Sequence, residues 1–153
     1  MLGWMILPFK RYVDFLGRSR RREFWLFIAL IWLVYAVLLF AFIGSGFSLD
    51  MLIDSGDRGL SSVLPVVFGG AGSLLGLWWL VTLVPTLAVT VRRLHDRNLS
   101  GWWLLGAWIA SIIPLVNFAA WIVMLVLLLL PGNEGLNAYG PDPKDPAGAD
   151  IFA

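Results

Sequence analysis

Residues 24–44 read FWLFIALIWLVYAVLLFAFIG and contain no Asp, Glu, Lys, Arg or His. Residues 63–91 and 102–130 are equally free of charge, so the chain has uncharged runs of 21, 29 and 29 residues. All 11 basic and 10 acidic residues lie outside these runs. About 20 helical residues are enough to cross the hydrocarbon core of a bilayer. Each run therefore predicts a membrane helix, because a backbone in hydrocarbon must satisfy its own hydrogen bonds.

Composition supports a membrane protein and excludes several other classes. Hydrophobic residues make up 59% of the chain and charged residues 14%, against roughly 45–50% and about 25% in soluble domains. The net charge of +1 gives no reason to expect a nucleic-acid partner. The chain has no cysteine and one histidine, which excludes disulfides, thiolate chemistry and His-rich metal sites. We therefore predict no cofactor, no metal site and no catalytic residues.

These features predict an all-α, polytopic transmembrane protein with three to four membrane helices. The run 24–44 is longer than the apolar part of a signal peptide, about 7–15 residues, so we expect a retained anchor. Residues 9–16 have apolar side chains at helical spacing and predict an amphipathic interfacial helix before the first span. We expect a single membrane domain over residues 1–143 and a flexible tail over residues 144–153.

The distribution of basic residues predicts the orientation in the membrane, because Lys and Arg are enriched in cytoplasmic loops. Residues 1–23 carry six Lys and Arg, and residues 92–101 carry three. Residues 45–62 and 131–153 carry one each. We therefore expect the N-terminus and the segment 92–101 in the cytoplasm, with the loop 45–62 outside.

The third run leaves two alternatives open. As one helix, residues 102–130 would reach about 43 Å, which is longer than the membrane core needs. Pro114 lies near the middle of this run and removes a helical hydrogen bond. The chain is therefore either one kinked span with its tail outside, or a hairpin turning at Pro114–Asn117 with its tail inside. The arms of that hairpin would be residues 102–113 and 115–130.

Three polar clusters lie at the edges of the uncharged runs. The first is Gly17-Arg18-Ser19-Arg20-Arg21-Arg22-Glu23-Phe24-Trp25. The second joins Arg92-Arg93-Leu94-His95-Asp96 to Ser100-Gly101-Trp102-Trp103. The third contains Asn137-Ala138-Tyr139-Gly140-Pro141-Asp142-Pro143. In order and spacing they resemble the motifs of a bacterial inner-membrane family, domain of unknown function 805, the YhaH/YhaI-like proteins. The resemblance implies an inner-membrane location and brings no established activity.

The first two clusters supply the candidate contacts with lipids or a partner. These are Arg18, Arg21, Arg22, Arg92, Arg93, His95, Asp96, Trp102 and Trp103. Basic residues beside a span attract anionic headgroups, or they serve only to set the topology. Asp96 follows Arg93 by three residues, so we expect these two side chains to pair. Ser100 is a candidate N-cap for a helix that begins near Gly101.

The third cluster supplies the candidates for docking of the tail, which are Asn137, Tyr139 and Asp142. If the third run is a hairpin, the tail shares a side with both basic clusters. Charge complementarity then predicts that Asp142 docks onto Arg92 or Arg93. The alternative is a solvated tail.

Three functions are compatible with this sequence. The leading hypothesis is a non-enzymatic membrane component whose Arg-rich cytoplasmic face contacts anionic lipids, a partner protein or a second copy. A small transporter or channel subunit is the first alternative, and its only hints are Ser111, Asn117 and the polar stripe formed by Thr82, Thr86 and Thr90. The second alternative is a membrane enzyme that acts on lipid headgroups through His95 and Asp96.

Overall fold

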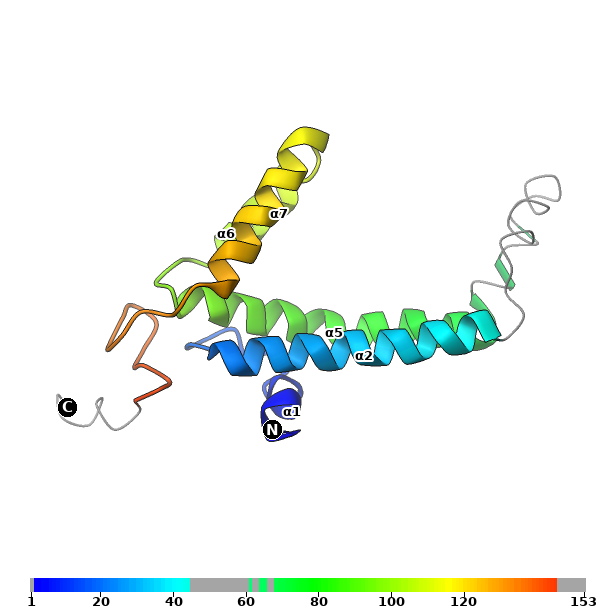
Figure 1. Cartoon of the computed structure of the whole chain (residues 1–153), viewed down its shortest axis with the longest axis horizontal. Coiled ribbons are helices and arrows are strands. Elements are labelled where there is room, and N and C mark those ends of the chain that lie inside the picture. The colour runs from blue at the N-terminus through cyan, green and yellow to red at the C-terminus, as the bar shows by residue number, and fades with distance from the viewer. Residues whose placement is uncertain (1, 45–60, 62–63, 66–67, 146–153) are drawn as a thin grey trace. The chain divides into compact units, whose positions relative to one another are not determined.

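The structure is a computed structural model of the 153-residue chain, and it describes residues 2–44, 61, 64–65 and 68–145. Every labelled element of the described residues is a helix, which confirms the all-α prediction (Figure 1). The helices are α1 (Leu2–Lys10), α2 (Arg21–Gly44), α5 (Gly70–His95), α6 (Trp102–Ala110) and α7 (Pro114–Leu129). The loop predicted at 45–62 and most of the tail predicted at 144–153 lie outside the described residues.

Two of these helices are long and apolar enough to cross a membrane. α2 has 24 residues and α5 has 26, which correspond to roughly 36 and 39 Å of helix. α2 contains the whole uncharged run 24–44 that predicted it, whereas α5 begins at Gly70, seven residues into the run 63–91, and extends past its end to His95. Basic residues occupy the first turn of α2 and the last turn of α5, at the ends of the apolar stretches.

The third run forms a helical hairpin and not one kinked helix, while the side of the membrane on which the tail lies stays a prediction. α6 and α7 pack against each other and run in opposite directions (Figure 1). The turn lies at residues 111–113 and therefore precedes the predicted turn at Pro114–Asn117. Pro114 is instead the first residue of α7, a position where its missing N–H costs nothing. The preceding residue, Ile113, is extended, as a residue before proline prefers.

The N-terminal helix differs from the predicted one at 9–16. α1 ends at Lys10, Pro8 lies inside it, and residues 14–17 are not helical. The physical reason is a long-range contact, because the Arg92 guanidinium binds the backbone carbonyls of Arg11 and Asp14 at 3.4 and 2.6 Å. Those hydrogen bonds hold the chain in an open turn where the local pattern alone favoured a helix.

The contacts divide the chain into two compact units, and α2 and α5 each run from one unit into the other. The first unit contains residues 1–28 and 84–153, and the second contains residues 29–83. In the first unit, the apolar side chains of Leu94, Ala107 and Met124 form a buried cluster. This cluster packs the hairpin of α6 and α7 against the end of α5, and all the candidate site residues lie in the same unit.

Candidate functional site

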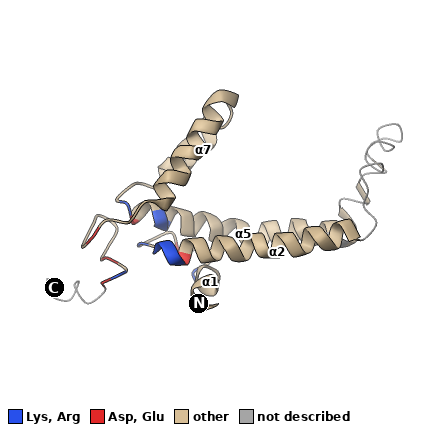
Figure 2. Cartoon of the chain, viewed as in Figure 1, with Lys and Arg blue, Asp and Glu red and all other residues tan. Residues whose placement is uncertain are grey.

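Charged residues of the first unit cluster along the chain where α2 begins, where α5 ends and where the chain leaves α7 (Figure 2). Arg92 and Arg93 are completely buried there, and Arg18 is only 6% exposed. A buried guanidinium is stable only when carboxylates and backbone carbonyls satisfy its donors. The partners of these arginines therefore define the interior of the site.

Arg92 is paired with Glu23, across a sequence separation of 69 residues. Its Nη2 donates to Glu23 Oε1 at 3.1 Å, and both side chains are almost inaccessible to solvent. The same guanidinium binds the open turn that follows α1 through its Nη1. Arg92 thus joins three segments of the chain, and Glu23, which our candidate list omitted, supplies the necessary negative charge.

The turn after α1 has an acidic residue of its own, Asp14, which is partly exposed and paired with Arg11 at 2.7 Å. Burial alone would raise the pKa of Asp14. Hydrogen bonds from Arg11 and from the Leu16 amide, together with the charges of Arg11 and Arg92, outweigh burial and lower the pKa from its usual value. Asp14 is therefore held ionised in the folded turn.

Asp96 is shared by Arg18 and Arg93. Arg18 Nη2 lies 2.9 Å from Asp96 Oδ1, and Arg93 Nη1 donates to Asp96 Oδ2. The predicted pairing of Arg93 with Asp96 is confirmed. Because Arg18 precedes α2 and Asp96 follows α5, this triad fixes the two helix ends to each other.

The same arginines also cap the end of α7. The last carbonyls of a helix lack intrahelical partners and carry partial negative charge. Arg93 Nε donates to the Leu128 carbonyl at 3.2 Å and its Nη2 donates to that of Leu130. Arg97 Nη1 donates to the Pro131 carbonyl at 3.0 Å. The C-terminus of the hairpin is therefore held by side chains from the end of α5.

Residues 131–142, which we call the strap, lie across the end of α5. The Tyr139 ring stacks on the His95 ring, with centroids 3.8 Å apart and planes 5° from parallel. Asn137 Nδ2 donates to the His95 carbonyl at 2.9 Å, and the Asn133 amide donates to the Asp96 carbonyl at 2.8 Å. The docking predicted for Asn137 and Tyr139 thus takes place on His95.

Asp142 differs from its prediction. It is buried, but its Oδ1 accepts the Lys144 amide at 2.8 Å. The carboxylates that neutralise Arg92 and Arg93 belong to Glu23 and Asp96 instead. The strap contributes backbone carbonyls to the arginines, since Arg18 binds the carbonyls of Asn133, Gly135 and Gly140.

Gly132 marks the closest approach of the strap to the buried charges. A Cβ atom at this position would fall on the Asp96 carboxylate. Only glycine therefore allows the strap to pass this close to Asp96. Glycine directly after Pro131 is an ordinary turn signal, so the sequence alone had no means of revealing this role.

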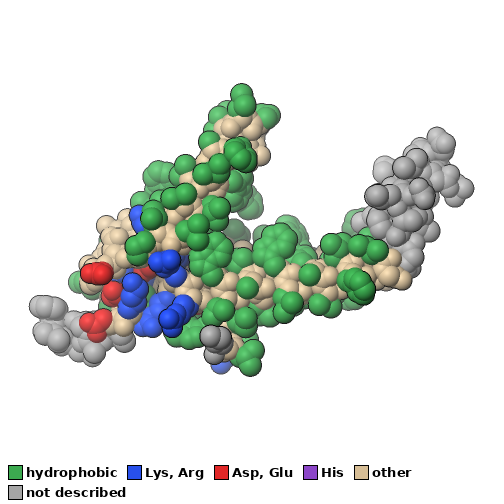
Figure 3. All heavy atoms as spheres, in the orientation of Figure 1, with side chains coloured by type: hydrophobic (Ala, Val, Ile, Leu, Met, Phe, Trp, Pro, Cys, Tyr) green, Lys and Arg blue, Asp and Glu red, His purple; other side chains and the backbone are tan. Residues whose placement is uncertain are grey.

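The other arginines of the first cluster face outward. Arg21 and Arg22 are exposed, and Arg20 is half-buried with its guanidinium 5.5 Å from the centre of the Trp4 ring. Within the described part of the chain, no carboxylate pairs with Arg21, Arg22 or Lys144. Figure 3 shows Lys and Arg side chains gathered on this face beside hydrophobic ones.

These outward cations line a surface hollow of about 990 Å³, which we call the cationic hollow. Its lining includes Trp4, Arg20, Arg21, Arg22, Trp25 and Lys144. Tryptophan prefers the headgroup level of a bilayer, and arginine binds phosphate with two parallel donors. Trp4, Arg20 and Lys144 were absent from our candidate list, and the aromatic residues near the first span were the signal available.

The contacts of His95, Asp96 and the threonines bear on the alternative functions. Asp96 is occupied by two arginines, and His95 Nδ1 lies 3.2 Å from the Gly17 carbonyl, to which it donates. Thr82 and Thr90 are buried and donate to carbonyls of their own helix. Among the described residues, no group of three metal-ligating side chains gathers.

Trp102 and Trp103 begin α6 and are 75% and 51% exposed. Ser100 Oγ accepts the Trp102 amide at 3.3 Å, while Gly101 occupies the N-cap position itself. The predicted capping by Ser100 is therefore shifted by one residue. Gly101 is needed there because a Cβ atom would lie 2.8 Å from Val91 Cγ1.

The comparisons with known proteins agree with this architecture. The model of the family described as "Protein of unknown function (DUF805)" matches residues 12–141. The chain belongs to this family. It is 36% identical to the inner membrane protein YhaI of Escherichia coli K12, over 94% of this chain and 97% of YhaI. It is 31% identical to the inner membrane protein YhaH of the same strain, over 94% of this chain and 98% of YhaH.

A third relative, the uncharacterized protein YiiR of the same strain, is 32% identical over 86% of this chain and 87% of its own length. No solved structure matches the chain significantly. The DUF805 match covers all three polar clusters up to Pro141, so the resemblance seen in the motifs is confirmed. The chain is thus a membrane protein of a family whose biochemical function is unknown.

Proposed function

We propose that this DUF805 protein is a non-enzymatic, multi-pass component of the inner membrane that binds anionic lipid headgroups from the cytoplasmic side. The observation that carries the proposal is the cationic hollow. It contains four basic residues, Arg20, Arg21, Arg22 and Lys144, together with two tryptophans. A membrane protein whose described cations lie beside aromatic rings at a span end is suited to phosphate-bearing headgroups.

The buried arginines support a common side for all three polar clusters. Arg18 before α2, Asp96 after α5 and the strap after α7 are joined by short hydrogen bonds. If α2 and α5 both cross the bilayer, these three segments must lie at the same membrane surface. The six Lys and Arg before the first span favour the cytoplasm for that surface.

The headgroup proposal is tested by native mass spectrometry of the detergent-purified protein with equal amounts of phosphatidylglycerol and phosphatidylcholine. We expect preferential binding of phosphatidylglycerol. Each basic residue near an anionic surface contributes about 1 kcal/mol. The double variant Arg21→Gln/Arg22→Gln should therefore bind phosphatidylglycerol roughly 30-fold more weakly.

Lys10→Gln is the control, because Lys10 is exposed and does not line the cationic hollow. Its loss of binding should be clearly smaller than the roughly fivefold loss per charge expected for residues of the hollow. Equal binding of both lipids by the wild-type protein would remove the proposal. Equal losses of phosphatidylglycerol binding in the double variant and in the control would show that the effect comes from unspecific charge and not from the cationic hollow.

The shared side is tested with single cysteines, since the natural chain contains none. Ser55→Cys and Ala153→Cys are probed in intact cells with a membrane-impermeant maleimide. We expect labelling of the first and not of the second. If both are labelled, the C-terminus is periplasmic and the strap cannot share a surface with the N-terminus.

The contacts favour this proposal over both alternatives. The Thr82 and Thr90 hydroxyls donate within their own helix, as packing residues do, and neither lines the cationic hollow. Asp96 is engaged by arginines and His95 by the strap and by Gly17, which supports a structural role for both residues. If a protein partner or a second copy occupies the cationic hollow instead, the lipid experiment would show that it displaces bound phosphatidylglycerol.

A further inference from the structure

A second hollow of the first unit is apolar and lies between α5 and α6. This groove has a volume of about 570 Å³, within the range of roughly 300–1,000 Å³ typical of small-ligand sites. Its walls include Leu87 and Val91 from α5 and Leu105 and Trp108 from α6. We infer that this groove binds one acyl chain of a membrane phospholipid, with the ester end of the lipid at His95 and Ser100.

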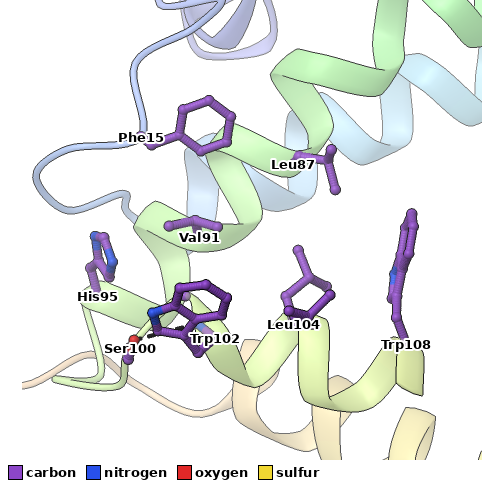
Figure 4. A pocket seen from close by; sticks show the side chains of 10 residues that line it. Phe15, Leu87, Val91, His95, Ser100, Trp102, Leu104 and Trp108 are labelled. Carbon is purple, nitrogen blue, oxygen red and sulfur yellow. Dashed lines mark hydrogen bonds between the residues drawn. The ribbon is translucent and has the colours of Figure 1, made fainter. Parts of the chain in front are cut away.

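The polarity of the groove changes along its length. Figure 4 shows His95 and Ser100 at one end, and Leu87 and Trp108 toward the other. Both polar residues sit at the end of the α5 span, where a bilayer changes from hydrocarbon to headgroups. A molecule with an apolar chain and a polar end matches this order of side chains.

The hydrogen-bonding state of the polar end favours an acceptor such as an ester carbonyl. Ser100 Oγ already accepts the Trp102 amide, so its own hydrogen remains to donate. His95 Nδ1 donates to the Gly17 carbonyl, which leaves Nε2 of the neutral ring as an acceptor, so Ser100 supplies the donor for an ester carbonyl at this end. The polar end presents no charged side chain, which separates this groove from the cationic hollow.

Two helices, α5 and α6, line this open groove and approach each other closely at its polar end. Gly101 lies against Val91, and no larger residue fits between the two helices there. The exposed Trp102 begins α6 at the polar end and stands at the level of the ester groups. Bulk lipid would cover all the exposed apolar helix surfaces equally, whereas this open groove offers walls from two helices and the Ser100 hydroxyl as a hydrogen-bond donor.

The test uses the full-length protein in nanodiscs of phosphatidylcholine that contains a photoreactive diazirine on one acyl chain. Cross-linked residues are located by mass spectrometry. We expect higher cross-linking yields at the groove residues Leu87, Val91 and Leu105 than at Leu125 of α7. Leu105 and Leu125 are matched, because they are 45% and 48% exposed.

Leu105→Trp fills the groove and should lower the cross-linking yield at Leu87 and Val91 roughly tenfold, the effect of about 1.4 kcal/mol of lost apolar burial. Leu125→Trp should leave that yield unchanged. Equal yields at all exposed apolar positions would mean annular lipid only and would overturn the inference. A lack of cross-links in the groove would also overturn it, because another segment or a second copy would then cover this face.

This inference stands apart from the proposed headgroup site. The probe is zwitterionic, and none of the groove residues named lines the cationic hollow. Arg21→Gln/Arg22→Gln should therefore leave cross-linking in the groove unchanged even if phosphatidylglycerol binding is lost. A parallel loss of both signals would contradict two separate sites.

Discussion

Two sets of arginines near the span ends have opposite environments. Arg18 is buried and bound to a carboxylate and to strap carbonyls, whereas Arg21 and Arg22 are exposed and lack a carboxylate partner among the described residues. Only two residues separate Arg18 from Arg21. Arginines near a span end therefore have two different roles. Those of the buried set hold the helix ends together, and those of the exposed set face outward.

The buried set explains the connection between distant segments. Arg18, Arg92 and Arg93 bind two carboxylates and the backbone of three separate segments. Burying a guanidinium is expensive, and here carboxylates and backbone carbonyls take up most of the donors, although Arg92 Nε has no hydrogen-bond partner among the described residues. These arginines therefore specify one arrangement of the helix ends, since other arrangements would leave buried charges without partners.

The largest expected effect comes from removing the charge of Asp96. Asp96→Asn leaves Arg18 and Arg93 buried without a carboxylate, and we expect a loss of about 3–5 kcal/mol in the free energy of unfolding. The measurement is unfolding of the detergent-solubilised protein by sodium dodecyl sulfate, followed by circular dichroism. Arg22→Gln is the control and should change stability by less than about 0.5 kcal/mol, as exposed substitutions do. Similar losses in the free energy of unfolding for both variants would contradict the difference between the buried and the exposed set.

A smaller effect is expected from Gly132→Ala. The new methyl group pushes against the Asp96 carboxylate and displaces either the strap or the ion pair. Overpacking of this kind costs about 1–3 kcal/mol. Gly106→Ala in α6 is the matched control, because a Cβ atom there meets open space. The same unfolding assay should show a loss only for Gly132→Ala, and unchanged stability would mean that the strap passes Asp96 at a greater distance.

The smallest effect concerns the stack of Tyr139 on His95. Tyr139→Ala removes this contact, which is worth about 0.5–1.5 kcal/mol beyond the buried area. We expect faster amide hydrogen exchange in residues 131–142, with little change in α2. Tyr139→Phe retains the ring and should exchange like the wild type. Equal acceleration in both variants would show that the ring does not hold the strap.

Much of the fold was accessible from the sequence. The uncharged runs predicted α2 and α5, and Pro114 marked the break between α6 and α7. The polar motifs also revealed the family and the local pair of Arg93 with Asp96, three residues apart. These features depend on composition, periodicity or short spacing, which a linear sequence displays directly.

The pairing of distant charges was decided only by the tertiary structure. The sequence suggested Asp142 as the acidic partner, but Glu23 neutralises Arg92 and Asp96 binds both Arg18 and Arg93. Charge alone does not distinguish one acidic residue near the membrane surface from another as the partner of a given arginine. The choice among them depends on which carboxylate the packed helices bring within hydrogen-bonding distance, and on the close passage that Gly132 permits.

The sequence by itself thus determined a helical membrane protein with arginines at its span ends. The tertiary structure decided which of those arginines are buried in ion pairs and which are exposed among the described residues. It also shifted the first helix away from 9–16, because Arg92 holds the carbonyls of the turn after α1. The physical reason is the same in both cases, since a buried guanidinium takes its partners from wherever the fold places them and overrides local preference.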